Sequence, residues 1–257
     1  MKIHTLTRKG FDHITFCEDF VVTHELENFL VGAVFDGCSG GGESHFASAL
    51  FGKSIKAQLI NFEGISLEMY STETLSKDLI YGTIPYLNNI KNVFKLSNNE
   101  LLTTILLFVF DKRNKSVNFV CVGDGVIAVK NNNDYTIPIN ISQNNKPRYI
   151  TYFLDPTEDV NEENLNISNL SDFSKWWEKE PYKLYLESVS DFTIATDGIN
   201  TFKNSKNDID YDPIKFLTED LKFVKNEVML PRKYNILKNN GWSNMDDIGM
   251  VRMIVEK

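Results

Sequence analysis

The stretch NFLVGAVFDG, from Asn28 to Gly37, is the most informative part of this sequence. Its aromatic and β-branched residues are typical of a buried β-strand. That strand ends in an aspartate followed by a glycine. Gly37 has no Cβ, so the backbone can turn there and come close to a neighbour. We therefore expect Asp36 and the carbonyl of Gly37 to present two hard oxygen atoms at the tip of a strand.

Acidic motifs recur beside three other apolar runs. DFTIAT precedes Asp197-Gly198, IGMVRMIV follows Asp246-Asp247, and Glu18-Asp19 lies in the run FDHITFCEDFVVTHE, which is expected to be a strand. Carboxylates gathered at one place repel each other unless a cation lies between them, and all-oxygen ligation favours Mg²⁺ or Mn²⁺ over Zn²⁺. The plainer interpretation is that Asp and Gly only mark turns. That interpretation suffices for one motif, whereas four motifs favour a metal site.

The composition is that of an ordinary globular protein, with 257 residues, 42% hydrophobic residues and a net charge of −8. The negative charge argues against a nucleic-acid partner. Cys17, Cys38 and Cys121 have no paired spacing that would indicate disulfides or a zinc site, and a reducing compartment fits them. No run has the length of a signal-peptide core or a membrane span. A cytoplasmic protein that binds no membrane is expected.

The remaining patterns predict an α+β layered fold in which strands bracket pairs of helices. The last strand is expected in the same sheet as the first motifs. Residues 131–181 are polar and Asn-rich and are predicted to form a flap or insertion. Within the expected strand 11–25, alternation would place His13 in phase with Asp19 and Glu18 on the opposite face. Helical patterns cover 44–60, 75–96 (interrupted near Gly82 and Pro85), 212–225 and 228–240, and strand patterns cover 101–110, 116–123, 126–130, 191–199 and 250–256.

Two rival sites begin at Cys38. The glycine-rich loop 38–42 could cradle a phosphate, although its spacing matches neither common nucleotide-binding fingerprint. Cys38 could also be a phosphatase nucleophile, but Ser44 stands where such enzymes carry an arginine. No nearby Lys or Arg would lower the pKa of the thiol. A packing role is favoured for Cys38, and Gly123-Asp124-Gly125 could be a simple hairpin turn.

Taken together, the motifs resemble the type 2C metal-dependent serine/threonine protein phosphatases (the PPM family). Gly10-x-x-His13 followed by Cys17-Glu18-Asp19 is similar to a bacterial branch that uses Gly-x-x-His and Cys-Gln-Asp. The resemblance extends from Gly10 to Glu256. The motifs that carry it occur in this order: Glu18-Asp19, Asp36-Gly37, Thr103-Thr104, Gly123-Asp124-Gly125, Asp197-Gly198 and Asp246-Asp247.

The resemblance implies a single phosphatase-like domain over 1–257, folded as a four-layer αββα sandwich of two antiparallel sheets flanked by helix pairs. Two Mn²⁺ or Mg²⁺ ions would sit at one end. Asp36 would bridge them and the Gly37 carbonyl would bind one, while Asp197 and Asp246 would bind the other. Asp19 would hold metal-bound water, and Asp124 would help to bind a third metal that some members contain. Glu18 and Asp247 would support the ligands without binding a metal directly.

The implied reaction is hydrolysis of phosphoserine or phosphothreonine in proteins by a metal-bridged water that attacks phosphorus, so no protein nucleophile is needed. Relatives often carry an arginine just before the first acidic motif, and here His13 is expected to hold the phosphate instead. Cys38 and Asp247 replace a histidine and an asparagine of the common pattern. The expected partners are phosphoproteins and a cognate serine/threonine kinase in bacterial signalling. The alternatives are a pseudo-phosphatase that only binds its partner and a nucleotide-binding protein.

Overall fold

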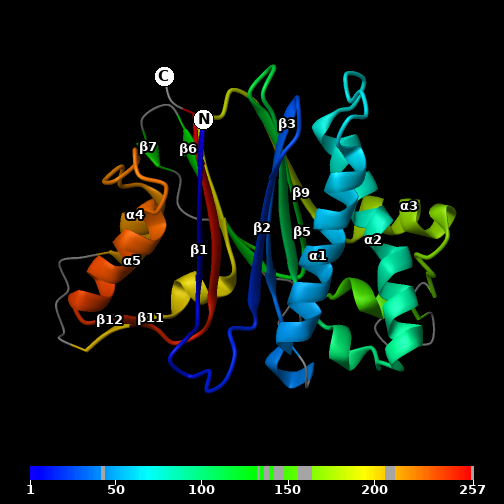
Figure 1. Ribbon diagram of the computed structural model, residues 1–257, viewed down its shortest axis with the longest axis horizontal. Coiled ribbons are helices and arrows are strands. Elements are labelled where there is room, and N and C mark those ends of the chain that lie inside the picture. Colours follow the sequence, from blue (N-terminus) through cyan, green and yellow to red (C-terminus); the bar gives the residue numbers. More distant parts are fainter. Residues whose placement is uncertain are drawn as a thin grey trace.

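The computed structural model describes residues 1–41, 44–131, 134–135, 139–141, 148–155, 164–205 and 212–255. Two antiparallel sheets stack face to face, and helices cover both outer faces (Figure 1). Three apolar clusters fill the spaces between these layers. Between the sheets, the ring of Phe192 packs edge-on against Phe108 and Phe119. The expected α+β sandwich, with helices outside two antiparallel sheets, is confirmed.

The first sheet has the strand order β2-β3-β4-β5-β9. Every residue of β4 and β5 is buried, because one face of the sheet meets helices and the other meets the second sheet. A polar turn at 111–115 joins these two strands. The strands are β2 (Asp19–Glu25), β3 (Phe29–Asp36), β4 (Ile105–Asp111), β5 (Ser116–Val122) and β9 (Tyr182–Leu186).

The second sheet has the order β1-β13-β10-β6-β7, and β8 also pairs with β6. The expectation that the last strand shares a sheet with the first motifs is wrong, because β13 pairs with β1 and β10. The strands are β1 (Lys2–Arg8), β6 (Gly125–Asn131), β7 (Asp134–Tyr135), β8 (Ile139–Ile141), β10 (Asp191–Ala195) and β13 (Ile248–Ile254); β11 (Phe202–Asn204) and β12 (Trp242–Asn244) form a separate ribbon.

Helices α1 (Ser44–Phe62), α2 (Thr72–Phe94) and α3 (Leu170–Lys179) lie on the side of the first sheet, and α4 (Pro213–Thr218) and α5 (Met229–Asn239) lie on the side of the second (Figure 1). Short 3₁₀ turns occur at Ser39–Gly41, Asn99–Leu101, Ile150–Phe153 and Asp197–Thr201. Among the helices described, none has the length and apolar character needed to cross a bilayer.

Helix α2 is continuous, so the expected interruption near Gly82 and Pro85 is wrong. Pro85 is on the exposed face, where water can satisfy the carbonyl that loses its amide partner. Gly82 faces α1 instead: its carbonyl accepts a hydrogen bond from Gln58 Nε2 at 3.0 Å, and a Cβ there would be 2.5 Å from Gln58 Oε1. The glycine thus permits close packing of the two helices.

The helix expected over 212–225 ends at Thr218. It begins normally, because the Asp212 side chain accepts from the backbone amides of Ile214 and Lys215. Its C-terminal carbonyls are bound by two buried cations. Lys233 Nζ donates to the Phe216 carbonyl, and Arg252 Nη1 donates to the Leu217 carbonyl at 3.0 Å. These side-chain donors satisfy the helix end where it stops.

The strand expected over 11–25 begins only at Asp19, and residues 9–18 form a loop. Backbone amides of this loop are bound by the segment before β13: Phe11 N donates to the Asn244 carbonyl and Asp12 N to the Met245 carbonyl, each at 3.0 Å. His13 and Glu18 therefore lie in a loop, and strand alternation does not set the direction of their side chains.

The predicted flap within 131–181 lies partly outside the described residues, and its role stays a prediction. Its last described part is α3, which packs Trp176 and Trp177 into the apolar cluster beside the first sheet.

Candidate metal centre

The site begins with two carboxylates on neighbouring strands. Asp19 starts β2 and Asp36 ends β3, and the two residues are register partners in the antiparallel pair. Asp19 is buried, and its Oδ2 accepts a hydrogen bond from Thr196 Oγ1 at 2.7 Å. Its Oδ1 is buried with no hydrogen-bond partner. A buried acceptor without a donor is costly unless another positive group faces it.

The second sheet contributes acids at the same end of the sandwich. Asp197 begins the 3₁₀ turn after β10, and Asp246 precedes β13. A Cβ on Gly198 would be 1.7 Å from the Asp247 carbonyl oxygen, so only glycine lets these two segments pack together. Gly198 of the expected Asp-Gly motif therefore has a packing role, and Asp197 supplies the carboxylate.

Asp124 lies in the turn between β5 and β6, which belong to different sheets. The turn is thus a crossover between layers and not the hairpin that a lone Gly-Asp-Gly would suggest. Its flanking residues Gly123 and Gly125 have φ of 98° and 154°. The left-handed backbone at Gly123 favours glycine. This turn carries Asp124 to the acidic cluster.

Backbone contacts hold Asp36 and Gly37 in place. Thr103 Oγ1 and Thr104 N each donate to the Asp36 carbonyl at 2.8 Å, which gives the Thr103-Thr104 motif a structural role. A Cβ on Gly37 would be 2.2 Å from the Ser44 carbonyl oxygen. The close approach at Gly37, expected from the sequence, is present where α1 begins.

The carboxylates perturb one another electrostatically. Burial raises the pKa of Asp19 to about 8 and the pKa of Asp124 to about 6. Burial also raises the pKa of Asp36 well above its ordinary range, and four neighbouring carboxylates act in the same direction: Asp19, Asp197, Asp246 and Asp124. The predicted ligands from both sheets are thus close enough to oppose each other's ionisation.

This cluster fits a hard divalent cation in donor chemistry. It offers carboxylate oxygens, a buried acceptor without a partner, and raised pKa values that a positive charge would reverse. Across the part of the chain that the structure describes, no three His, Cys, Asp or Glu side chains already form a coordination set. The fit of the cluster to a cation therefore rests on its negative charge and its oxygen ligands.

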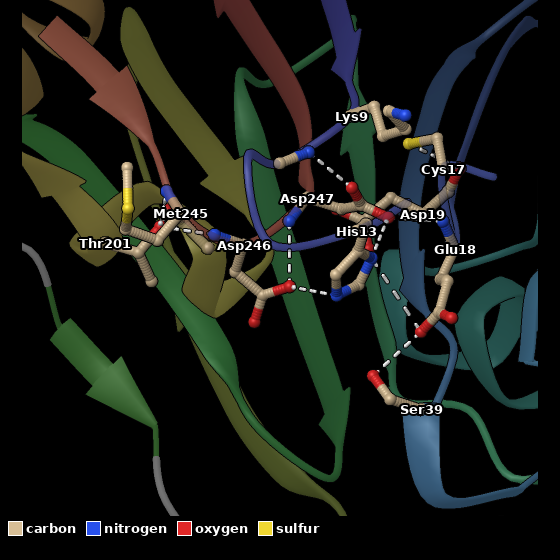
Figure 2. A network of polar contacts seen from close by, with 12 residues as sticks. Lys9, His13, Cys17, Glu18, Asp19, Ser39, Thr201, Met245, Asp246 and Asp247 are labelled. Carbon is tan, nitrogen blue, oxygen red and sulfur yellow. Dashed lines mark hydrogen bonds and ion pairs between the residues drawn. The ribbon is translucent and has the colours of Figure 1, made fainter. Parts of the chain in front are cut away.

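His13 lies between three carboxylates (Figure 2). Its Nδ1 is 2.9 Å from Asp247 Oδ2 and 4.0 Å from Glu18 Oε2, and its Nε2 is 3.1 Å from Asp246 Oδ1. Burial alone would lower the pKa of His13, but the charges of Asp247, Glu18 and Asp246 outweigh burial and raise it. With acceptors at both nitrogens, the imidazolium satisfies both contacts.

Glu18 and Asp247 are the two carboxylates on the Nδ1 side of His13. Glu18 Oε2 accepts from Ser39 Oγ at 2.9 Å. Asp247 is buried and accepts hydrogen bonds from two backbone amides, Gly10 N at 2.6 Å and Glu18 N. The carboxylate of Asp247 thus ties both ends of loop 9–18 to the start of β13.

Sequence reasoning missed two residues of the site. Thr196 bridges to Asp19, and its only signal was a hydroxyl directly before Asp197. Tyr149 lies near the Cys38 thiol, and burial raises the pKa of its phenol, with the thiol acting in the same direction. No motif marks Tyr149, which follows a polar stretch. Burial raises the pKa of the Cys17 thiol to about 12, so that thiol is protonated near neutrality.

A cavity of about 450 Å³ opens beside His13 and Glu18. His13, Glu18 and Ser39 form part of its wall, so it is continuous with the polar network. Phe16 and His45 also line it, and their rings stack with centroids 4.3 Å apart. The cavity thus has a polar side at His13 and Glu18 and an aromatic side at Phe16 and His45.

Residues 12–231 match the family model described as protein phosphatase 2C. Three crystal structures are similar over nearly the whole chain. Stp1 of Staphylococcus aureus has a TM-score of 0.61 at 12% identity, covering 99% of this chain and 95% of its own. The phosphatase PstP/Ppp of Mycobacterium tuberculosis has 0.57 at 16%, covering 100% and 99%. RsbX in complex with magnesium has 0.54 at 14%, covering 99% and 94%. A comparison with curated proteins gives no match.

Proposed function

Because the chain belongs to the protein phosphatase 2C family, we propose that it hydrolyses phosphoserine and phosphothreonine in proteins with the help of bound Mn²⁺ or Mg²⁺. One observation carries the proposal. The pair of buried Asp19 and partly buried Asp36 faces acids from the opposite sheet, and Asp19 Oδ1 has no donor. A site kept in this state without a cation is unfavourable.

Each residue then has a role. Asp36, Asp197, Asp246 and the Gly37 carbonyl would hold two ions, and Asp124 would help to hold a third. When bound, such ions activate water and stabilise the charge on a phosphoryl group. Asp19 would orient bound water, and Thr196 fixes the Asp19 carboxylate through the 2.7 Å hydrogen bond. Glu18 and Asp247 contact His13 and would support the cluster without binding a metal.

The substrate is proposed to be a phosphorylated protein, supplied by a serine/threonine kinase in bacterial signalling. Its chain would enter through the cavity beside the cluster, where Phe16 and His45 offer an aromatic surface next to the reacting phosphate. Exposed aromatic side chains beside a polar site are typical of a contact surface for a partner.

A second candidate is a pseudo-phosphatase that binds phosphoproteins without turnover. The observation that favours it is the lack of a free phosphate clamp in the described network. His13 faces carboxylates at both nitrogens, and Lys9 Nζ donates to the Ile14 carbonyl at 2.8 Å. The intact acidic cluster favours the enzyme, because a binding module has no need of opposed carboxylates.

The deciding experiment measures hydrolysis of p-nitrophenyl phosphate and of a phosphothreonine peptide, with and without Mn²⁺. Metal-dependent turnover of both substrates supports the enzyme. Binding of the phosphopeptide without turnover at any metal concentration supports the pseudo-phosphatase. Tight nucleotide binding without Mn²⁺-dependent hydrolysis would support a nucleotide-binding protein.

A further inference from the structure

His13 contacts two consecutive aspartates through its two ring nitrogens (Figure 2). Nδ1 is 2.9 Å from Asp247 Oδ2, and Nε2 is 3.1 Å from Asp246 Oδ1. A single ring that contacts both side chains restricts their relative orientation. Both ring nitrogens are therefore engaged by carboxylates.

Asp247 is the fixed end of this arrangement. It is buried, its Oδ1 accepts from Gly10 N, and its Oδ2 accepts from Glu18 N and contacts His13. The backbone is tight here, because a Cβ on Gly10 would be 2.3 Å from the Met245 carbonyl oxygen. Both oxygens of Asp247 are thus held by protein groups, and Asp247 is an anchor.

Asp246 is the adjustable end. Its side chain is partly exposed, and its Oδ1 accepts from its neighbour's amide, Asp247 N, at 2.8 Å as well as facing His13 Nε2. One hydrogen bond and one close ion-pair contact on the same oxygen restrict the orientation of the carboxylate and so the direction of Oδ2. A carboxylate that must bind a metal gains affinity when its orientation is fixed before the ion arrives.

We propose that His13 is a positioning residue: it is anchored on Asp247 and holds the Asp246 carboxylate in the orientation that binds metal. The proposal rests on the proposed function, in which Asp246 is a ligand. It replaces the sequence-based expectation that His13 contacts the substrate phosphate, and the two roles differ in what they change. Positioning affects metal affinity, whereas a phosphate contact affects the KM of the substrate.

The test titrates Mn²⁺ into metal-free protein by isothermal calorimetry and measures p-nitrophenyl phosphate kinetics on the same samples. His13→Ala should weaken Mn²⁺ binding by about 10- to 100-fold, the usual effect of losing a partner of a ligand. At saturating Mn²⁺ its KM should equal that of wild type and most of kcat should return. His13→Gln, which keeps an amide donor near the Nε2 position, should recover part of the affinity.

His24→Ala is the matched control. His24 is as exposed as His13 (16% against 17%) and also pairs with a carboxylate, Glu63, away from the cluster. It should bind Mn²⁺ like wild type. Circular dichroism verifies folding, and if His13→Ala is unfolded, His13→Gln decides the question.

An unchanged Mn²⁺ affinity in folded His13 variants overturns the proposal, and a raised KM in the same variants would identify a phosphate contact instead. Wild-type protein that binds Mn²⁺ but hydrolyses nothing refutes the proposed function alone, because the affinity comparison still tests His13. Wild-type protein that binds neither Mn²⁺ nor Mg²⁺ refutes both.

Discussion

Asp19 and Asp36 stand directly opposite each other on β2 and β3, with both carboxylates at the end of the first sheet. Like charges in such a pair destabilise a sheet, and burial makes the repulsion stronger. In the described residues, Thr196 is the side chain that donates to Asp19, and Asp19 Oδ1 is left without a donor. The pair therefore lowers the stability of the metal-free fold at the proposed site.

The metal-free protein should become less stable as pH rises toward 8. Burial raises the pKa of Asp19 from 3.8 to about 8, so between these values the folded state binds more protons than the unfolded state. Stability is then present at low pH and is lost as pH rises through the folded-state pKa. Thermal melts in EDTA at pH 6 and pH 8 measure the effect.

The variant Asp36→Asn separates this effect from other titrating groups. It removes one of the opposed charges, so it should melt higher than wild type at pH 8 in EDTA and show a smaller difference between the two pH values. Added Mn²⁺ should raise the melting temperature of wild type most at pH 8, where the ligands are ionised. A wild-type protein that melts higher at pH 8 than at pH 6 in EDTA contradicts the prediction.

Hydrolysis of p-nitrophenyl phosphate should require Mn²⁺ or Mg²⁺ and should cease in EDTA. Asp36→Asn and Asp197→Asn should each lower kcat/KM by at least about 100-fold, because each removes charge from the cation site. Glu178→Gln changes an exposed acid on α3 and serves as the control. Full activity in both aspartate variants would refute the proposed metal site.

The apolar runs predicted most of the sandwich, because buried strands such as Ile105–Asp111 need long stretches of β-branched and aromatic residues. The sequence also placed the acids of Asp36-Gly37, Asp197-Gly198 and Asp246-Asp247 at strand ends. The strand prediction was wrong for residues 9–18, whose aromatic residues are typical of a strand. These residues form a loop because the buried carboxylate of Asp247 accepts hydrogen bonds from the amides of Gly10 and Glu18. That contact joins residues more than 200 positions apart, and local patterns carry no sign of it.

Cys38 should be dispensable for the chemistry. Its thiol lies near the Tyr149 phenol, and no described contact places a basic group beside it. Cys38→Ser should keep more than about half of kcat with p-nitrophenyl phosphate, because a hydroxyl preserves the contact with the phenol. Tyr149→Phe, which removes the hydroxyl near Cys38, is the matched comparison. Loss of turnover in Cys38→Ser with Mn²⁺ still bound would assign the thiol a catalytic role.

The buried ion pair Arg252–Asp191 should matter for stability and not for catalysis. Arg252 Nη2 is 2.8 Å from Asp191 Oδ2, and the guanidinium also binds carbonyls at the end of α4. Arg252→Met leaves a buried carboxylate unpaired and should lower the free energy of unfolding in urea by about 3–5 kcal/mol. Arg113→Met, at a more exposed pair, should cost roughly 1 kcal/mol. Equal losses in the two variants would contradict the prediction.

Phe16 should affect protein-like substrates more than small ones. Its ring is 55% exposed and stacks on His45 at the wall of the cavity. Phe16→Ala should raise the KM for a phosphothreonine peptide by about 2- to 10-fold, the loss of one aromatic contact, and leave p-nitrophenyl phosphate unaffected. Ile65→Ala, at a residue of similar exposure (54%) beyond the far end of α1, is the control. An equal effect on both substrates would place Phe16 in the catalytic machinery.

The hydroxyl of Thr196 has a consequence for the mechanics of the whole sandwich. It accepts from Gly249 N of β13 and donates to Asp19 of β2, so one oxygen atom connects the two sheets at the acidic end. Any sliding of one sheet over the other must break this link before it disturbs the apolar interior. Thr196→Val would therefore loosen interlayer alignment, and faster amide hydrogen exchange at Gly249 and Asp19 would be its first sign.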